Sequence, residues 1–336
     1  MIQEDIRVKE IRELWRRWSD ARKDWDTQAR EDVDFYLGNH FSQDEVNALA
    51  ERNQSAMPMD RLYSAIEQFK AIITSKPPKF SAVGREDSDT KLANVWKVIL
   101  EYIWDLSDGD ETFKQVIHDY TVTGLGYFYA YIDPESDYGR GEVKFTYVDP
   151  FRVVVDPNAR SRWFDDAAGM MLSTILTKLQ LLDLYPQLAQ VEEGKDKPLI
   201  DEIEGISGDE DYPSSTQKQT KPSFTPDITK DLDFGEGSEK YRLIESFSKV
   251  KVPYYRMVDL QTGNEKIVDD EALAKLMQDE RTALAMEKGM LDFVQVMQTR
   301  IKITCSVGQI VLYERVLESD VYPIVPVPNI WTNTPY

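Results

Sequence analysis

Residues 119–133 read DYTVTGLGYFYAYID, and within this stretch the chain changes its hydrophobic period. Upstream, apolar residues recur every three or four positions, as on one face of a helix: Phe113, Val116, Ile117 and Tyr120. Downstream, residues 127–132 form a run of aromatic and aliphatic side chains, which is typical of a strand. Gly124 and Gly126 lie between them and predict a tight turn that leads from a helix directly into a sheet.

Strand-like segments continue after this turn. Residues 143–148 alternate apolar and polar side chains, so we expect them to pair with residues 127–132 as a hairpin closed by residues 133–141. Further strands are expected at 151–155 and 170–177, set apart by the Asp-Pro pairs 149–150 and 156–157. A short helix at 179–184 should then stop at Tyr185-Pro186.

Helical spacing dominates before the turn. Residues 2–37 predict one or two amphipathic helices with a tryptophan-rich face, ending with Gly38 as the cap. A second helix should begin near Pro58 and stop before Pro77. A third, capped by Ser88 or Asp89, has a wide apolar face made of Leu92, Val95, Trp96, Ile99, Leu100, Ile103 and Trp104. A turn at 105–110, with Asp108 as its cap, should lead into the fourth helix.

The second half of the chain is less regular. Residues 190–239 carry fourteen acidic residues against five basic ones and few apolar residues, which predicts a flexible segment. We expect strands at 241–249 and 253–259, a mainly helical stretch at 269–298, and strands at 301–305 and 310–316. The prediction is an α+β fold: an α/β body at 1–186 with helices packed on a mainly antiparallel sheet, an acidic flexible insert at 187–240, and a second small α/β portion at 241–336.

Composition narrows the classes of protein. The 336-residue chain carries a net charge of −20, which argues against tight binding of nucleic acid over its whole surface. No apolar run approaches the roughly 18 residues of a membrane helix, and residues 1–20 do not resemble a signal peptide. The single cysteine, Cys305, cannot form an internal disulfide and falls in an alternating run, which indicates a buried strand thiol.

Motifs for chemistry are missing from the sequence. There is no phosphate-binding loop, and no G-x-S-x-G nucleophile elbow. His40 and His118 have no cysteine near them, so a His/Cys metal cluster is not expected. The acidic run 105–111 lacks the spacing of a calcium loop, and Tyr127, Tyr129 and Tyr131 are better explained as a core or interface face than as a base-stacking platform. We therefore predict no catalytic residues, no cofactor and no metal, and a protein that is not an enzyme.

The order of these segments resembles the portal proteins of tailed bacteriophages, of the podovirus type. The similar pieces begin with a charged, tryptophan-bearing first helix (2–34), an FYLGNHF element (Phe35–Phe41) and a Pro-Pro segment (Lys76–Val83). The helix-to-strand junction (Asp119–Tyr127) follows, and then the paired Asp-Pro turns (Val148–Ala159) with Asp166-Ala167 and Tyr185-Pro186. The last pieces are the acidic insert (190–239) and a proline-spaced end (Pro323–Asn329). The match covers most of 1–186 and is looser from 240 onward.

The resemblance implies a subunit of a ring, expected to be a dodecamer, at one vertex of the capsid in the virion, assembled in the host cytoplasm. Its expected partners are further copies of itself, the major capsid protein, adaptor and tail proteins, the terminase large subunit during packaging, and double-stranded DNA that passes through without specific binding; no membrane is involved. Such portals are commonly longer, so the resemblance implies that this chain is their N-terminal half.

Ring contacts of this kind are heterologous, with one patch of a subunit meeting a different patch on the next. The tryptophan-rich first helix is our candidate for such a patch, through Trp15, Trp18 and Trp25. Two other classes stay open at this point. One is another virion assembly protein, such as an adaptor or scaffold, although the β-rich middle argues against it. The other is a hydrolase with paired carboxylates, which would need both in one concave pocket.

Overall fold

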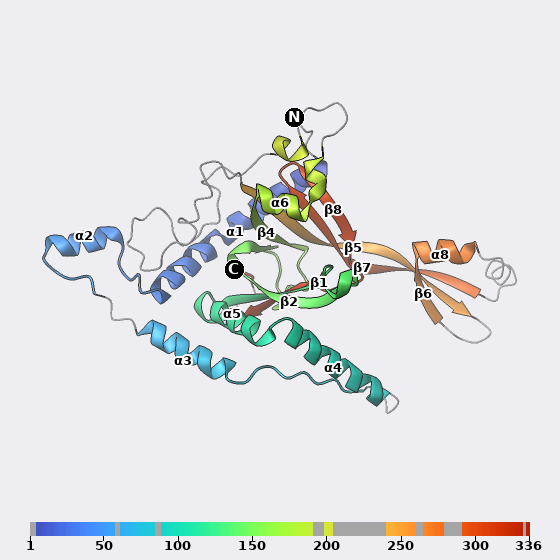
Figure 1. The fold of residues 1–336 in the computed structure, drawn as a ribbon, viewed down its shortest axis with the longest axis horizontal. Helices are drawn as coiled ribbons and strands as arrows, with labels where there is room; N and C mark the ends of the chain where they lie inside the picture. Colours follow the sequence, from blue (N-terminus) through green and yellow to red (C-terminus); the bar gives the residue numbers. More distant parts are fainter. Residues whose placement is uncertain are drawn as a thin grey trace. The chain divides into compact units, whose positions relative to one another are not determined.

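The computed structural model describes residues 5–57, 61–84, 89–190, 198–203, 240–259, 265–278, 291–331 and 334–336. The chain divides into two compact units. Unit 1 comprises Met1–Ser246, Thr304–Tyr313 and Pro323–Tyr336, and unit 2 comprises Phe247–Ile303 and Glu314–Tyr322. Helices and antiparallel sheets make up the fold, so the predicted α+β class is confirmed (Figure 1).

The N-terminal segment forms one long helix, α1 (Ile6–Tyr36), rather than two. Asp5 caps it, because its carboxylate accepts a hydrogen bond from the Arg7 backbone N–H at 2.9 Å. The helix ends as predicted at Gly38, whose φ of 82° places it in the left-handed region. The Gly38 N–H donates to the Phe35 carbonyl at 3.1 Å, which satisfies one of the last helical acceptors.

Four further helices precede the first strand: α2 (Gln43–Glu51), α3 (Leu62–Thr74), α4 (Thr90–Leu106) and α5 (Gly109–Val122). Pro58, expected near the start of α3, lies outside the described residues. Asp89 and Asp108 occupy the N-cap positions of α4 and α5, but neither side chain makes the expected capping hydrogen bond. Asp108 instead adopts a φ of 46°, which lets the chain reverse between the two helices.

The glycine turn after α5 is confirmed. Gly124 has a φ of 79°, a conformation that L side chains rarely adopt. Gly126 is needed for another reason: a Cβ there would lie 2.6 Å from the backbone oxygen of Val116. Helix α5 therefore packs closely against β1 (Leu125–Asp133) because Gly126 has no side chain.

The first sheet has the strand order β2-β1-β9. Strand β2 (Glu142–Val148) pairs antiparallel with β1, Tyr127 lying opposite Val148, so the predicted hairpin is confirmed. Strand β9 (Ile324–Pro328) pairs with the other edge of β1, Leu125 lying opposite Pro328. This last pairing joins segments about two hundred residues apart, and no local sequence pattern predicts it.

The second sheet has the order β3-β4-β5-β7-β8, and β6 pairs with β5. Its strands are β3 (Val153–Val155), β4 (Gly169–Thr177), β5 (Lys240–Asp259), β6 (Glu265–Asp269), β7 (Leu291–Val307) and β8 (Ile310–Val316). The two strands expected at 241–249 and 253–259 are one strand. Pro253 removes one backbone donor, but its φ is compatible with extended structure, so the strand continues.

The helix expected over 269–298 is wrong in its second part. Helix α8 covers Asp270–Met277, and residues 291–298 belong to β7. Leu291 and Val294 are three residues apart, a spacing that is also compatible with one face of a helix. Pairing along the sheet overrides this spacing, and the neighbouring aromatic and β-branched residues favour a strand. The turn expected at 261–264 lies outside the described residues.

One core cluster of unit 1 lies under α6 (Lys178–Leu184), which is capped by Thr177 in a capping box with Gln180. The cluster contains Leu181, Leu188, Ile200, Ile203, Tyr241, Leu243, Cys305 and Val307. Cys305 is thus the buried strand thiol that was predicted. The start of the expected flexible insert is also packed: η4 (Pro186–Ala189) and η5 (Leu199–Glu202) supply Leu188 and Ile200. Residues 204–239 lie outside the described residues. No helix in the described ranges is long and apolar enough to cross a membrane.

Candidate functional site

The tryptophan face of α1 packs against its own chain. Trp18 is 7% exposed and lies in a core cluster with Ile11, Val154, Met171 and Ile244. Trp15 is partly buried against the same cluster. The indole of Trp25 lies 5.7 Å from the ring of Phe151 and 6.2 Å from that of Tyr336. All three side chains have partners within unit 1, and Trp18 is removed from the surface; the role of the three in subunit contacts stays a prediction.

Arg22 fastens α1 to the segment before β3. Its side chain is 4% exposed, and its guanidinium donates to the carbonyls of Pro150 (3.1 Å), Phe151 (2.9 Å) and Val153. The carboxylate of Asp26 lies 2.8 Å away as an ion pair. A buried guanidinium needs several acceptors to offset its lost hydration, and here the backbone supplies most of them. The segment that begins at the first Asp-Pro turn therefore presents its carbonyls to α1.

Helix α4 exposes more large apolar side chains than any other helix in the described ranges. Trp96 is 53% exposed, although a side chain of this size normally contributes strongly to a core. The other exposed apolar residues of the helix are Leu92, Val95, Val98, Ile99 and Tyr102. A contiguous apolar patch of this size marks an interaction surface. The predicted apolar face of the helix exists, but the described residues of the chain leave most of it uncovered.

The reason is that α4 has two apolar faces. Ala93, Leu100 and Trp104, spaced seven and four residues apart, face the rest of unit 1; Ala93 is buried and the other two are partly buried. The Trp104 ring lies 5.4 Å from Phe80 and 5.3 Å from Phe145, and its Nε1 donates to Asp110. The uncovered residues Leu92, Val95, Trp96 and Ile99 follow the spacing of a second face, about a third of a turn away at 100° per residue.

A polar hollow of about 640 Å³ lies between α3 and α5. Lys70 joins its walls: the Nζ atom lies 2.7 Å from the Glu67 carboxylate and 3.0 Å from His118 Nδ1. Tyr36 donates to the same Glu67 carboxylate at 2.6 Å and meets the His118 ring edge-on at 5.0 Å. Burial and the neighbouring Lys70 lower the pKa of His118 below its ordinary value. His118 therefore has structural partners on α1 and α3.

Asp119 closes one side of this hollow. It is buried, and the Tyr147 hydroxyl on β2 donates to its carboxylate at 2.5 Å. Burial raises the pKa of Asp119 to about 7, although the Tyr147 hydrogen bond acts in the opposite direction. Asp149 is a partly buried carboxyl, and burial raises its pKa as well. Nothing local in the sequence marks Asp119 as a buried carboxyl among the sixty acidic residues.

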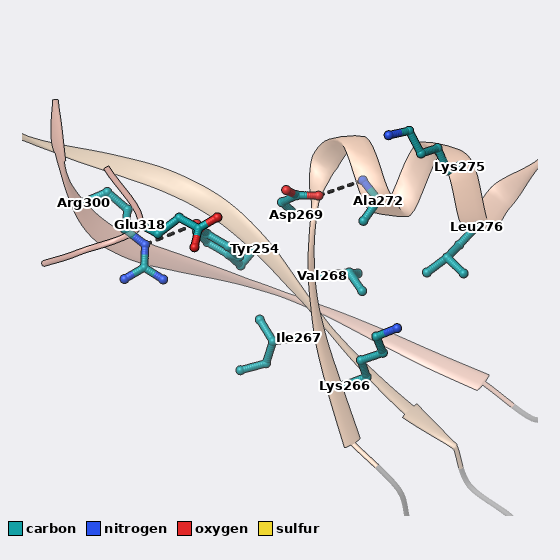
Figure 2. A pocket seen from close by; sticks show the side chains of 10 residues that line it. All are labelled: Tyr254, Lys266, Ile267, Val268, Asp269, Ala272, Lys275, Leu276, Arg300 and Glu318. Atoms are coloured by element: carbon teal, nitrogen blue, oxygen red, sulfur yellow. Dashed lines mark hydrogen bonds between the residues drawn. The ribbon is translucent and has the colours of Figure 1, made fainter. Parts of the chain in front are cut away.

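Unit 2 has an open hollow of its own, of about 520 Å³. Figure 2 shows Arg300 and Glu318 beside the Tyr254 ring at one end, with β6 and α8 at the other. The guanidinium of Arg300 lies 4.9 Å from the centre of the Tyr254 ring, and its Nε donates to the hydroxyl at 3.2 Å. Lys266 and Lys275 add two amines, and Asp269 caps α8 through the Ala272 N–H at 2.7 Å.

These hollows are polar recesses on the surface, and several of their side chains contact one another, as Lys70 does His118 and Arg300 does Tyr254. Across the part of the chain that the structure describes, no group of three or more His, Cys, Asp or Glu side chains is arranged to hold a metal ion. The arrangement that stands out is instead the uncovered apolar surface of α4, which is suited to contact with another protein.

A family of known proteins matches the chain. The family model described as phage P22-like portal protein matches residues 12–334, almost the whole chain. No curated protein matches the chain. Portal proteins are structural components of the virion: they form oligomeric rings in the capsid, serve genome packaging, and have tail and terminase proteins as partners. The chain belongs to the P22-like phage portal protein family.

Proposed function

We propose that this chain is a ring subunit at the capsid vertex that forms the channel for DNA packaging and ejection. The observation that carries the proposal is the family match over residues 12–334, together with a subunit that leaves a large apolar surface uncovered on α4. A monomer with such a surface would tend to associate. In a ring, every subunit can bury this surface through the same kind of contact with its neighbour.

The charge of the chain suits a conduit. With a net charge of −20 in each subunit, a ring multiplies a negative field. DNA phosphates meet repulsion over most of such a surface, so the duplex can slide without being held. The ring would also dock the terminase large subunit during packaging and adaptor or tail proteins afterwards.

Imaging of the purified chain tests the proposal. Negative-stain electron microscopy and mass photometry should show closed rings with a central hole, and we expect twelve subunits in each. A chain that stays monomeric at every concentration and salt condition tried would overturn the proposal.

A second measurement addresses the conduit. Fluorescence anisotropy with labelled duplex DNA should detect no tight binding to the rings at physiological salt, and little change as the salt concentration is lowered. Tight binding that weakens steeply with salt would mean that the ring holds DNA and would contradict a sliding channel.

A further inference from the structure

We propose that the uncovered face of α4 in one subunit packs against an uncovered face of α3 in the next copy of this chain. The inference rests on the proposed ring and names the two surfaces that close it. It assigns the contact between subunits to helices α3 and α4, and not to the tryptophan face of α1.

The α4 side of the contact consists of Leu92, Val95, Trp96 and Ile99. These residues lie at positions i, i+3, i+4 and i+7, so they form one continuous stripe. The helix is held in place from its other face by Ala93, Leu100 and Trp104, and at its end by Ser107, whose Oγ accepts the Phe145 N–H at 3.1 Å. The uncovered stripe is therefore presented by a helix whose orientation is already fixed.

The α3 side of the contact has the same construction. Leu62, Phe69 and Ile72 are exposed, and Ile72 is 67% exposed. On the helix wheel these three lie within about a quarter of a turn of one another. The opposite edge of the helix, with Glu67 and Lys70, is bound to α5 and α1 through His118 and Tyr36. Helix α3 is thus also anchored on one side and apolar on the other.

The pairing of unlike faces follows from ring geometry. A closed ring of identical subunits needs a patch that meets a different patch on its neighbour. Helices α3 and α4 both pack on α5, and Figure 1 shows them extending on different sides of it in this view. Each subunit therefore carries two distinct apolar patches on one scaffold, which is what a head-to-tail contact requires.

The size of the two faces is sufficient. At on the order of 100 Å² for each large side chain, the seven residues would bury several hundred Å² of apolar surface. A standard interface buries about 1,600 Å², of which a little over half is non-polar. The two stripes thus account for most of the apolar centre of one such contact.

Cysteine cross-linking between two different variants tests the pairing. The only native cysteine, Cys305, is fully buried, so an engineered surface cysteine is the accessible thiol. One preparation carries Val95→Cys on α4 and a second carries Ile72→Cys on α3, each with one added cysteine in the full chain. The two are mixed, assembled into rings and treated with a short bis-maleimide. Leu179→Cys, at an exposed position on α6, is the control for random collision.

We expect covalent dimers in the mixture of the two variants and none above the Leu179→Cys background in either variant alone. Strong dimers from Val95→Cys alone would mean that α4 meets α4, and would overturn the pairing. Rings that are visible by microscopy but give no Val95–Ile72 cross-link would overturn it as well, while the proposed function would stand. A wild-type chain that forms no rings would overturn the proposed function, and this inference with it.

A charge variant provides an independent reading. Trp96→Glu should abolish rings and leave a folded monomer with the melting temperature of the wild-type monomer, measured below the concentration of ring assembly, because position 96 is exposed in the subunit. Leu179→Glu is the matched control and should assemble normally. Rings that form in the Trp96→Glu variant with wild-type yield would contradict a role for this face.

Discussion

Helices α1 and α4 have similar sequences in one respect: each combines charged residues with a wide apolar face that contains tryptophan. Their environments differ. The tryptophan face of α1 lies in the core of its own chain, with Trp18 at 7% exposure, whereas Trp96 of α4 is 53% exposed. A hydrophobic period shows which side of a helix avoids water, and it does not show which molecule covers that side.

The difference has a structural cause. The apolar face of α1 meets β3 and β4 directly, through Val154 and Met171. The apolar surface of α4 is wider than its contact with unit 1, so one face is used by the chain and another is left over. The remaining face is suited to a second copy.

The largest expected difference between α1 and α4 is in the effect of replacing their tryptophans on the free energy of unfolding. Trp18→Ala should lower the free energy of unfolding of the subunit by about 3–5 kcal/mol, because it opens a cavity in the core. Trp96→Ala should lower it by only about 1 kcal/mol, because about half of the Trp96 side chain is already exposed to water. Urea unfolding of the monomer, at a concentration below ring assembly, measures both. Equal losses in the two variants would remove the distinction between the helices.

The attachment of α1 is tested by Arg22→Met, which keeps the length of the side chain and removes its charge. We expect a loss of about 3 kcal/mol, because Asp26 loses its partner and the carbonyls of Pro150, Phe151 and Val153 lose a donor. Lys97→Met is the matched control on α4, where an exposed ion pair with Glu101 contributes little. The Arg22→Met variant should melt at a clearly lower temperature than the Lys97→Met variant. Similar melting temperatures would mean that Arg22 does not stabilise the attachment of α1.

Helix α5, which supports both α3 and α4, should make the stability of the subunit depend on pH. The pKa of Asp119 is about 7 in the folded chain against an ordinary 3.8, so between these values the native state holds a proton that the unfolded chain has lost. Stability should therefore fall as the pH rises through this window. Asp119→Asn keeps an acceptor for Tyr147 without the charge, and should gain about 2 kcal/mol above the window.

Urea midpoints at about pH 5 and about pH 8 for both proteins measure this effect as a difference of differences. Only the part of the pH dependence that disappears in the Asp119→Asn variant is assigned to this carboxyl. Parallel slopes in the two proteins would show that Asp119 is ionised in the native state throughout.

The smallest effect concerns the attachment of α4 to its own sheet. Ser107→Ala removes the oxygen that accepts the Phe145 N–H and should cost about 1 kcal/mol. Because the stripe on α4 depends on a fixed helix, ring yield should fall slightly as well. Hydrogen exchange of the Phe145 amide, followed by mass spectrometry, should speed up. Unchanged exchange would mean that Ser107 does not hold the helix.

Much of the architecture could be predicted locally. The helix over residues 6–36, the glycine turn and the hairpin of β1 and β2 depend on period and on glycine geometry, which neighbouring residues supply. The end of the chain could not be placed in this way, because β9 pairs with β1 across about two hundred residues. Residues 291–298 were assigned to the wrong class, because a spacing of three is compatible with a helix and the sheet that overrides it is distant in sequence.

The candidate surface could likewise be predicted only in part from the sequence. The sequence by itself determined that α1 and α4 each have a tryptophan-bearing apolar face, that the chain is strongly acidic, and that its segments follow the order of a portal protein. Only the tertiary structure decided that Trp18 is covered and Trp96 is not, that α4 has a second apolar face, and that Asp119 is buried beside Tyr147. Amphipathicity is a local property of one helix, whereas burial depends on every other segment that packs against it.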